Sequence, residues 1–173
     1  GSANSQAYAF QYGFQLASAR GAVFTPHTRV LTPFADVTPT GTERIGMHLG
    51  TGDQDNYVRL AVTGAGSTRS VVLEREFGGA FTPIASANVT LPSSGYVDLF
   101  LAVNPTTHAV QPSYQITNGT TTGPRTNLGT PLALPDAWFT RAALAAGVIA
   151  TSGGAASFPA TWDMFEIQSP ASP

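Results

Sequence analysis

Residues 45–62 read IGMHLGTGDQDNYVRLAV, and this stretch decides the fold class of the chain. Apolar residues occupy every second position from Ile45 to Leu49 and again from Val58 to Val62. Side chains two positions apart on a strand point to the same face of a sheet. Residues 51–56, between the two runs, are rich in Gly, Asp and Asn, which is typical of a tight turn. The stretch therefore predicts two antiparallel strands that share one buried face.

The same alternation recurs along most of the chain. It predicts strands over residues 8–16, 70–77 and 97–103, and further strands near 23–31, 80–90, 109–117, 143–151 and 160–168. Residues 142–150 also have helical propensity, but Gly147 and the flanking Gly153 and Gly154 favour a strand. A single short helix is expected at residues 135–139. About ten short strands separated by turns predict an all-β chain, a two-sheet antiparallel β-sandwich of the jelly-roll type.

The composition excludes several classes of function. The chain has 173 residues, of which 10% are charged, with a net charge of −2 and no Cys. Its basic residues are all Arg and assemble no basic face, so nucleic acid and anionic membranes are poor partners. The lack of Cys removes disulfides and thiolate metal sites. The chain has no apolar run of the length that a transmembrane helix needs.

The length fits one domain, which we expect over residues 7–168. The opening Gly1-Ser2 looks like a cloning scar, so residues 1–6 are expected to be a tag remnant and an N-terminal tail. Residues 169–173 are rich in Pro and Ser, which is typical of the start of a linker. The sequence therefore favours one module excised from a larger secreted protein, located outside the cell or on its surface.

Four segments together carry a family resemblance. In chain order they are residues 45–60, 132–138, 146–151 and 159–167, which read as strand–turn–strand, a Pro-Asp-Ala-Trp corner, a strand and a closing strand. This order resembles the concanavalin A-like, laminin-G-type sandwich modules of bacterial extracellular proteins. The resemblance implies two curved antiparallel sheets and a concave face that often binds glycans, in the manner of a carbohydrate-binding module. It also implies that a structural calcium could be present.

The alternation defines a candidate ligand-binding face. Where Met47, Leu60, Leu73 and Leu99 face the core, their neighbours point outward. Aromatic rings can stack on the CH faces of a sugar, and carboxylate and guanidinium groups can bond its hydroxyls. An ordinary solvated sheet face is the alternative interpretation. The predicted contacts are His48, Tyr57, Arg59, Glu74, Glu76, Tyr96, Asp98 and Phe100, with Gln111 and Gln115 on the same predicted face.

Three aspartates are candidate metal ligands. Asp53 and Asp55 lie in the predicted turn at residues 51–56. Calcium is bound by carboxylate and carbonyl oxygens. Asp163, in the closing strand, is the third candidate, because related modules can hold calcium near that strand. The alternative for the first two is a hydrogen-bonded turn, and for Asp163 a hydrogen bond to a loop. No cofactor is required by the sequence.

One pair of carboxylates suggests catalysis. Glu74 and Glu76 are two positions apart on a predicted strand, so they share a face about 6.5–7 Å apart at the backbone. Glycosidases use two carboxylates about 5–9.5 Å apart. Arg75 stands between them, however, and the longer acidic motif of related sandwich hydrolases is absent.

These observations give three functional hypotheses. The first is a non-catalytic, lectin-like module that binds an extracellular polysaccharide on the concave face. The second is a structural or adhesion spacer between neighbouring domains. The third is a small glycoside hydrolase that uses Glu74 and Glu76.

Overall fold

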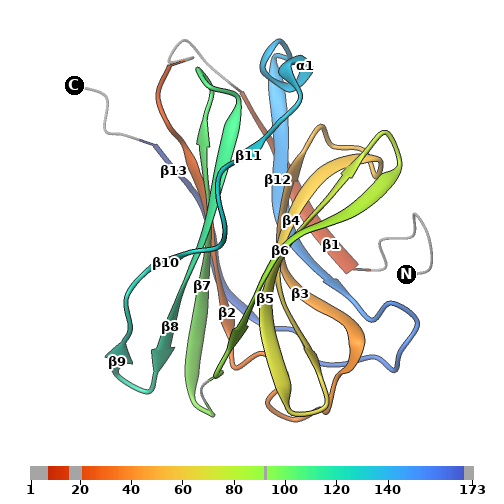
Figure 1. Ribbon diagram of the computed structural model, residues 1–173, viewed down its shortest axis with the longest axis vertical. Helices are drawn as coiled ribbons and strands as arrows, with labels where there is room; N and C mark the ends of the chain where they lie inside the picture. The colour runs from red at the N-terminus through yellow and green to blue at the C-terminus, as the bar shows by residue number, and fades with distance from the viewer. Residues whose placement is uncertain (1–7, 16–20, 92, 170–173) are drawn as a thin grey trace.

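The chain folds into a β-sandwich of two antiparallel sheets, as the sequence predicts (Figure 1). The structure, a computed structural model, describes residues 8–15, 21–91 and 93–169. The expected tag remnant and tail at residues 1–6 lie outside the described residues, as do residues 170–173 of the expected linker.

Sheet A contains residues 45–62, the stretch that decides the fold class. Among the described residues it has six strands, in the order β1 (Tyr8–Gln15), β12 (Ala143–Thr151), β3 (Thr40–Gly50), β4 (Asn56–Ala65), β5 (Thr68–Phe77) and β6 (Ala80–Val89). The strands β3 to β6 follow one another through hairpins, whereas β1 and β12 join from the two ends of the chain.

Sheet B forms the second layer. Its main path runs β10 (Thr126–Asn127), β8 (Ala109–Asn118), β7 (Gly95–Asn104), β2 (Thr25–Leu31) and β13 (Trp162–Gln168). Two further short strands, β9 (Thr121–Thr122) and β11 (Leu132–Ala133), pair with β8. The short helix α1 (Asp136–Phe139) follows β11.

The core lies between the two sheets and is apolar. Met47, Leu60 and Leu73 enter it from sheet A, and Leu99 and Leu101 enter it from sheet B, all of them fully buried. Each such side chain contributes about 1.5–3 kcal/mol by leaving water. Trp138 belongs to this core and is 2% exposed, whereas Trp162 packs against it and donates from its Nε1 to the carbonyl of Gly46 (3.1 Å).

The predicted long strands are confirmed to within a few residues, and so is the short helix. The segment 142–150 is a strand, because its alternate residues face the core, Leu144 and Ala146 among them. The prediction missed β9, β10 and β11, which have two residues each and are too short to show a period. Residue 16, predicted at the end of the first strand, lies outside the described residues.

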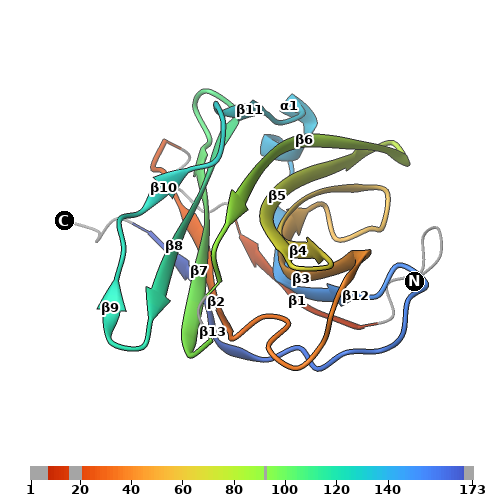
Figure 2. The ribbon, with the colours of Figure 1, turned by 60° about the horizontal axis from the view of Figure 1, so that its bottom comes forward.

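Sheet A is strongly curled, and its outer face is concave (Figure 2). In β4 every residue from Tyr57 to Gly64 is buried, although only one face of the strand packs on the core. Close approach of the strands accompanies this curl. A Cβ added to Gly147 would clash with the carbonyl oxygen of Phe10, and one added to Gly46 would clash with that of Leu60. The concave face is therefore sheltered by the curvature of its own sheet.

Candidate functional site

The concave face of sheet A gathers polar side chains from the neighbouring strands β3, β4 and β5. The strand register puts His48 opposite Arg59, Arg59 opposite Glu74, and Tyr57 opposite Glu76. All five residues are 9% exposed or less. Buried polar and charged groups are costly unless they are paired, so their partners determine what the face can do.

Glu74 is held by two guanidinium groups. Its Oε1 accepts from Nε of Arg44 (3.0 Å), and its Oε2 accepts from Nε of Arg59 (2.9 Å) and contacts Nη2 of Arg59 (2.7 Å). Arg44 also donates to the hydroxyl of Thr63 (2.5 Å) and to the carbonyl of Gly41 (2.9 Å). These charge-assisted bonds compensate one buried carboxylate with two cations.

Glu76 and Phe81 lie at the β5–β6 end of the face. The hydroxyl of Tyr57 donates to Oε2 of Glu76 (2.9 Å), and burial raises the pKa of Tyr57 to about 12, so its proton stays in place. Phe81 lies opposite Glu76 on β6 and is 51% exposed, with Cζ of Arg59 6.0 Å from its ring centroid. An exposed ring beside a buried polar row is a suitable stacking surface for a sugar.

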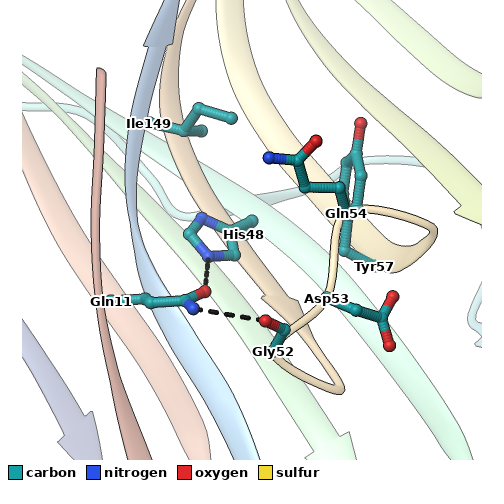
Figure 3. Close-up of a pocket in the computed structure, with 7 residues that line it drawn as sticks. All are labelled: Gln11, His48, Gly52, Asp53, Gln54, Tyr57 and Ile149. Atoms are coloured by element: carbon teal, nitrogen blue, oxygen red, sulfur yellow. Dashed lines mark hydrogen bonds between the residues drawn. The ribbon is translucent and has the colours of Figure 1, made fainter. Parts of the chain in front are cut away.

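A cavity opens at the β1–β12 end of the same face. Its volume is about 240 Å³, and the residues that line it come from β1, β3, β4, β12 and the β3–β4 loop: Gln11, His48, Gly52, Asp53, Gln54, Tyr57 and Ile149 (Figure 3). Nε2 of His48 lies 3.2 Å from Oε1 of Gln11, and Nε2 of Gln11 donates to the carbonyl of Gly52 (3.4 Å). Burial, assisted by the positive charge of Arg59, lowers the pKa of His48 to about 4, so the imidazole is uncharged at neutral pH.

The outer face of sheet B carries a second polar network. The buried Asp98 accepts from Nε of Arg29 (2.9 Å) and lies 3.0 Å from Nε2 of His27. Nδ1 of His27 is 3.0 Å from Glu166 on the neighbouring strand β13. Burial opposes the charge of Asp98, but the hydrogen bonds from His27 and Arg29 outweigh it and lower its pKa. The pKa of Glu166 is lowered by its bond to His27 as well.

The aromatic rings of this outer face already have partners. Cζ of Arg29 lies 3.7 Å above the ring of Tyr96, and Cζ of Arg125 lies 3.8 Å from the ring centroid of Phe100. Phe100 also stacks on His27, with 4.2 Å between the ring centroids. The protein's own cationic and imidazole groups thus occupy surface that a sugar would need.

The prediction of one shared binding face is therefore wrong in its geometry. The structure brings together His48, Tyr57, Arg59, Glu74 and Glu76 on sheet A, but it puts Tyr96, Asp98, Phe100, Gln111 and Gln115 on the outer face of sheet B. The alternation correctly gave the outward side of each strand. Alternation is a property of one strand, so it could not show which strands share a sheet. Outward residues on opposite layers of a sandwich point in opposite directions and form separate faces.

The predicted metal ligands do not meet. No three His, Asp or Glu side chains among the described residues form a group that could hold a metal ion. Asp53 accepts from Thr51, from the backbone N–H of Asp55 and from Asn56, which organises the turn. Asp163 lies on sheet B, 3.7 Å from Arg29. A single site that uses Asp53, Asp55 and Asp163 is ruled out, and calcium bound at the turn alone stays a prediction.

Several residues of the concave face of sheet A, which we call the cleft, were not predicted from the sequence. Arg44 has the parity of His48 on its strand, and Phe81 is symmetrical with Glu76 about the Gly78-Gly79 turn, so both had a local signal. Gln11 lies on the polar side of the predicted strand 8–16, but no local signal linked it to His48, because their contact spans 37 positions of the chain.

The fold is a two-sheet antiparallel β-sandwich, and solved structures of several other proteins share it. The GH43B protein of the Bacteroides ovatus xyloglucan PUL is 13% identical, with a TM-score of 0.62 over 93% of this chain and 32% of its own. The xylan β-1,4-xylosidase of Bacillus halodurans is 11% identical, with a TM-score of 0.62 over 86% of this chain and 28% of its own. The alginate lyase of Pseudomonas aeruginosa is 12% identical, with a TM-score of 0.58 over 96% of this chain and 76% of its own.

These likenesses show the fold. The chain spans about a third of the length of the first two structures and about three-quarters of the lyase. No protein-family model and no curated protein sequence matches the chain, so the concanavalin A-like family stays a prediction. The described residues also include no helix with the length and apolar character needed to cross a membrane.

One prediction is corrected by these comparisons. The sequence favours a module without catalytic activity, but the solved structures that share this fold over part of their length include two enzymes, a xylan β-1,4-xylosidase and an alginate lyase. An enzyme was not favoured from the sequence because local spacing shows no complete catalytic motif.

Proposed function

We propose that this chain is a carbohydrate-active enzyme domain that binds a polysaccharide in the concave cleft of sheet A and cleaves it. One observation carries the proposal: a cavity lined by Gln11, His48 and Tyr57 opens on a face whose other polar groups are already paired with one another. Such a site offers a few convergent polar groups in a sheltered hollow, the usual form of a small-molecule site.

The cleft has the complementary parts that a sugar chain requires. The exposed ring of Phe81 offers a stacking surface at one end, and the amide and imidazole groups offer hydrogen bonds at the other. The carbohydrate-active neighbours with the same fold support a polysaccharide as the ligand. We place the activity outside the cell, where such polymers are encountered.

The paired carboxylates are poor candidates for the chemistry. Both oxygens of Glu74 accept from arginines, and Glu76 accepts from Tyr57. A glycosidase needs one carboxyl group free to give a proton and the other free to attack or to activate water. The cavity side of the cleft, where the imidazole of His48 is uncharged, is the better location for the reaction.

Incubation with soluble xylan and with alginate tests the proposal. Reducing ends report hydrolysis, and ultraviolet absorbance of an unsaturated product reports elimination. Phe81→Ala is expected to weaken binding about tenfold by removing the stacking ring. Phe10→Ala is the matched control, because Phe10 is also an exposed ring (62%) but its side chain points to the opposite face of sheet A.

A result in which the protein neither binds nor cleaves either polymer contradicts the proposal for these substrates. Equal losses in Phe81→Ala and Phe10→Ala would contradict the location of the cleft. Binding without product would leave the cleft in place and refute the enzymatic part.

A further inference from the structure

One ring nitrogen of His48 has no hydrogen-bond partner within the part of the chain that the structure describes. The residue is 9% exposed, and its Nδ1 is buried without a hydrogen bond to any described residue. Figure 3 shows this nitrogen on the side of the ring toward Ile149, away from the nitrogen that contacts Gln11. Buried polar atoms in folded proteins are almost always hydrogen bonded, so an unpaired nitrogen on a residue that lines a cavity indicates a missing partner.

The hydrogen bonds around the cavity decide the tautomer of His48. The carbonyl of Gly52 can only accept, so the amide group that faces it must be the NH₂ of Gln11. The other end of that amide, Oε1, faces Nε2 of His48 and can also only accept. Nε2 must therefore carry the proton. Since a neutral imidazole has one N–H, Nδ1 is left as a bare acceptor.

Burial, more than charge, keeps the ring neutral. Burial and the charge of Arg59 on β4 lower the pKa of His48 to about 4. The other charged or titratable groups on this side are Arg44 on β3, Asp53 in the loop, Tyr57 on β4, and Glu74 and Glu76 on β5, the two glutamates being paired as described above. At neutral pH the cavity thus presents an acceptor at this position and no donor.

We propose that Nδ1 of His48 accepts a hydrogen bond from a hydroxyl group of the bound saccharide, and that Gln11 is the positioning residue that fixes the accepting tautomer. This inference rests on the proposed function. An acceptor at this point favours a sugar that carries a free hydroxyl and rejects one whose hydroxyl is replaced by an ether or ester, because neither can donate.

Access to Nδ1 requires one side chain to move. The atom is shielded from solvent, and Gln54 from the β3–β4 loop extends its amide toward His48 in Figure 3. Gln54 is exposed and makes no hydrogen bond to another described residue. Its rotation breaks no bond within the described structure, so the ligand hydroxyl can replace it above the ring.

Nitrogen NMR of the imidazole tests the tautomer without any ligand. At pH 7 we expect the proton of His48 on Nε2 and the shift of an unprotonated nitrogen at Nδ1. His48→Gln assigns the signals, and Gln11→Leu is expected to mix the two tautomers, because it removes the acceptor that selects one. A proton on Nδ1 in the unaltered protein overturns the inference, as does a tautomer that Gln11→Leu leaves unchanged.

Two isosteres test the ligand contact. His48→Asn keeps an oxygen near the position of Nδ1, whereas His48→Gln keeps a polar atom near Nε2 and loses the Nδ1 acceptor. With xylo-oligosaccharides and alginate oligosaccharides as probes, we expect His48→Gln to bind about tenfold more weakly and His48→Asn to stay within about threefold of the unaltered protein. Gln54→Ala should bind at least as tightly.

The outcomes separate the two proposals. Equal affinities in the His48→Asn and His48→Gln variants, whether both retained or both lost at matched melting temperatures, overturn the role of Nδ1. If the unaltered protein binds neither probe, the proposed function and the saccharide contact both fail, and the tautomer is judged by NMR alone.

Discussion

The two outward faces of this sandwich use the same chemistry to different ends. Each face has a buried carboxylate with two basic partners. On sheet A, Glu74 is bonded to Arg44 and Arg59. On sheet B, Asp98 is bonded to Arg29 and His27. On sheet B the rings of Tyr96 and Phe100 are also covered by arginines, so the network is closed. On sheet A the network ends beside a cavity and an exposed ring.

Curvature explains the difference. Sheet A shelters its outer face by curling, so polar groups there lose water without being covered by another layer. Sheet B gains burial only where one side chain lies on another, as Arg29 lies on Tyr96. A concave face can therefore keep a sheltered opening for a ligand, whereas the outer face of sheet B must fill its own contacts. Four changes can break or sharpen this comparison.

The largest change in the free energy of unfolding is expected when Arg59 is removed. Arg59→Ala leaves Glu74, which is 3% exposed, with Arg44 as its remaining cation, and should lower the free energy of unfolding by about 3 kcal/mol. Arg29→Ala is the matched change on sheet B and should cost about 1 kcal/mol, because Arg29 is partly exposed and Asp98 keeps His27. Urea denaturation of both variants measures this, and equal losses would refute the asymmetry.

A pH titration of stability should isolate His48. Its folded-state pKa is about 4, whereas an unfolded histidine titrates near 6.5, so protons bind the unfolded chain more strongly between these values. The free energy of unfolding should therefore fall by about 2 kcal/mol between pH 7 and pH 4.5. Because His48→Gln removes this contribution, its stability should fall less than that of the unaltered protein by that amount. Parallel pH curves for the two proteins would contradict a neutral buried His48.

The contribution of Asp98, on the outer face of sheet B, to the free energy of unfolding should change at a lower pH than that of His48. The pKa of Asp98 is lowered in the folded protein, so its contribution is present above the unfolded value, near 3.9, and is lost as the pH falls below it. Asp98→Asn should cost about 1.5 kcal/mol at pH 7, and its stability should approach that of the unaltered protein between pH 4 and pH 2. Asp55→Asn, in an exposed turn, serves as the control and should have little effect at either pH.

The smallest expected effect compares two tyrosine hydroxyls. Tyr57→Phe removes the donor to the buried Glu76 and should cost about 1 kcal/mol. Tyr96→Phe should be nearly neutral, because Tyr96 offers its ring to Arg29 and its hydroxyl bonds no other described residue. Thermal melting of the two variants is sufficient, and a larger loss in Tyr96→Phe would show that the outer network depends on a contact beyond the ring.

The long strands could be predicted because their signal is local. A period of two is set by the geometry of a single strand, so it shows in residues 45–49, 58–62 and 97–103 without knowledge of their neighbours. The same rule gave the outward side of His48, Arg59 and Glu74. The short strands β9 to β11 carry too few residues for a period and were missed.

The sequence by itself determined an all-β sandwich and the side of each long strand that faces the core. Tertiary structure alone decided the cleft: it separated Asp98 and Phe100 from Glu74 by a whole layer, and it brought Gln11 to His48 across 37 positions of the chain. The physical reason is that strand order and sheet curl arise from contacts between distant segments. A local alternation shows which side of a strand is polar, but not which polar sides meet.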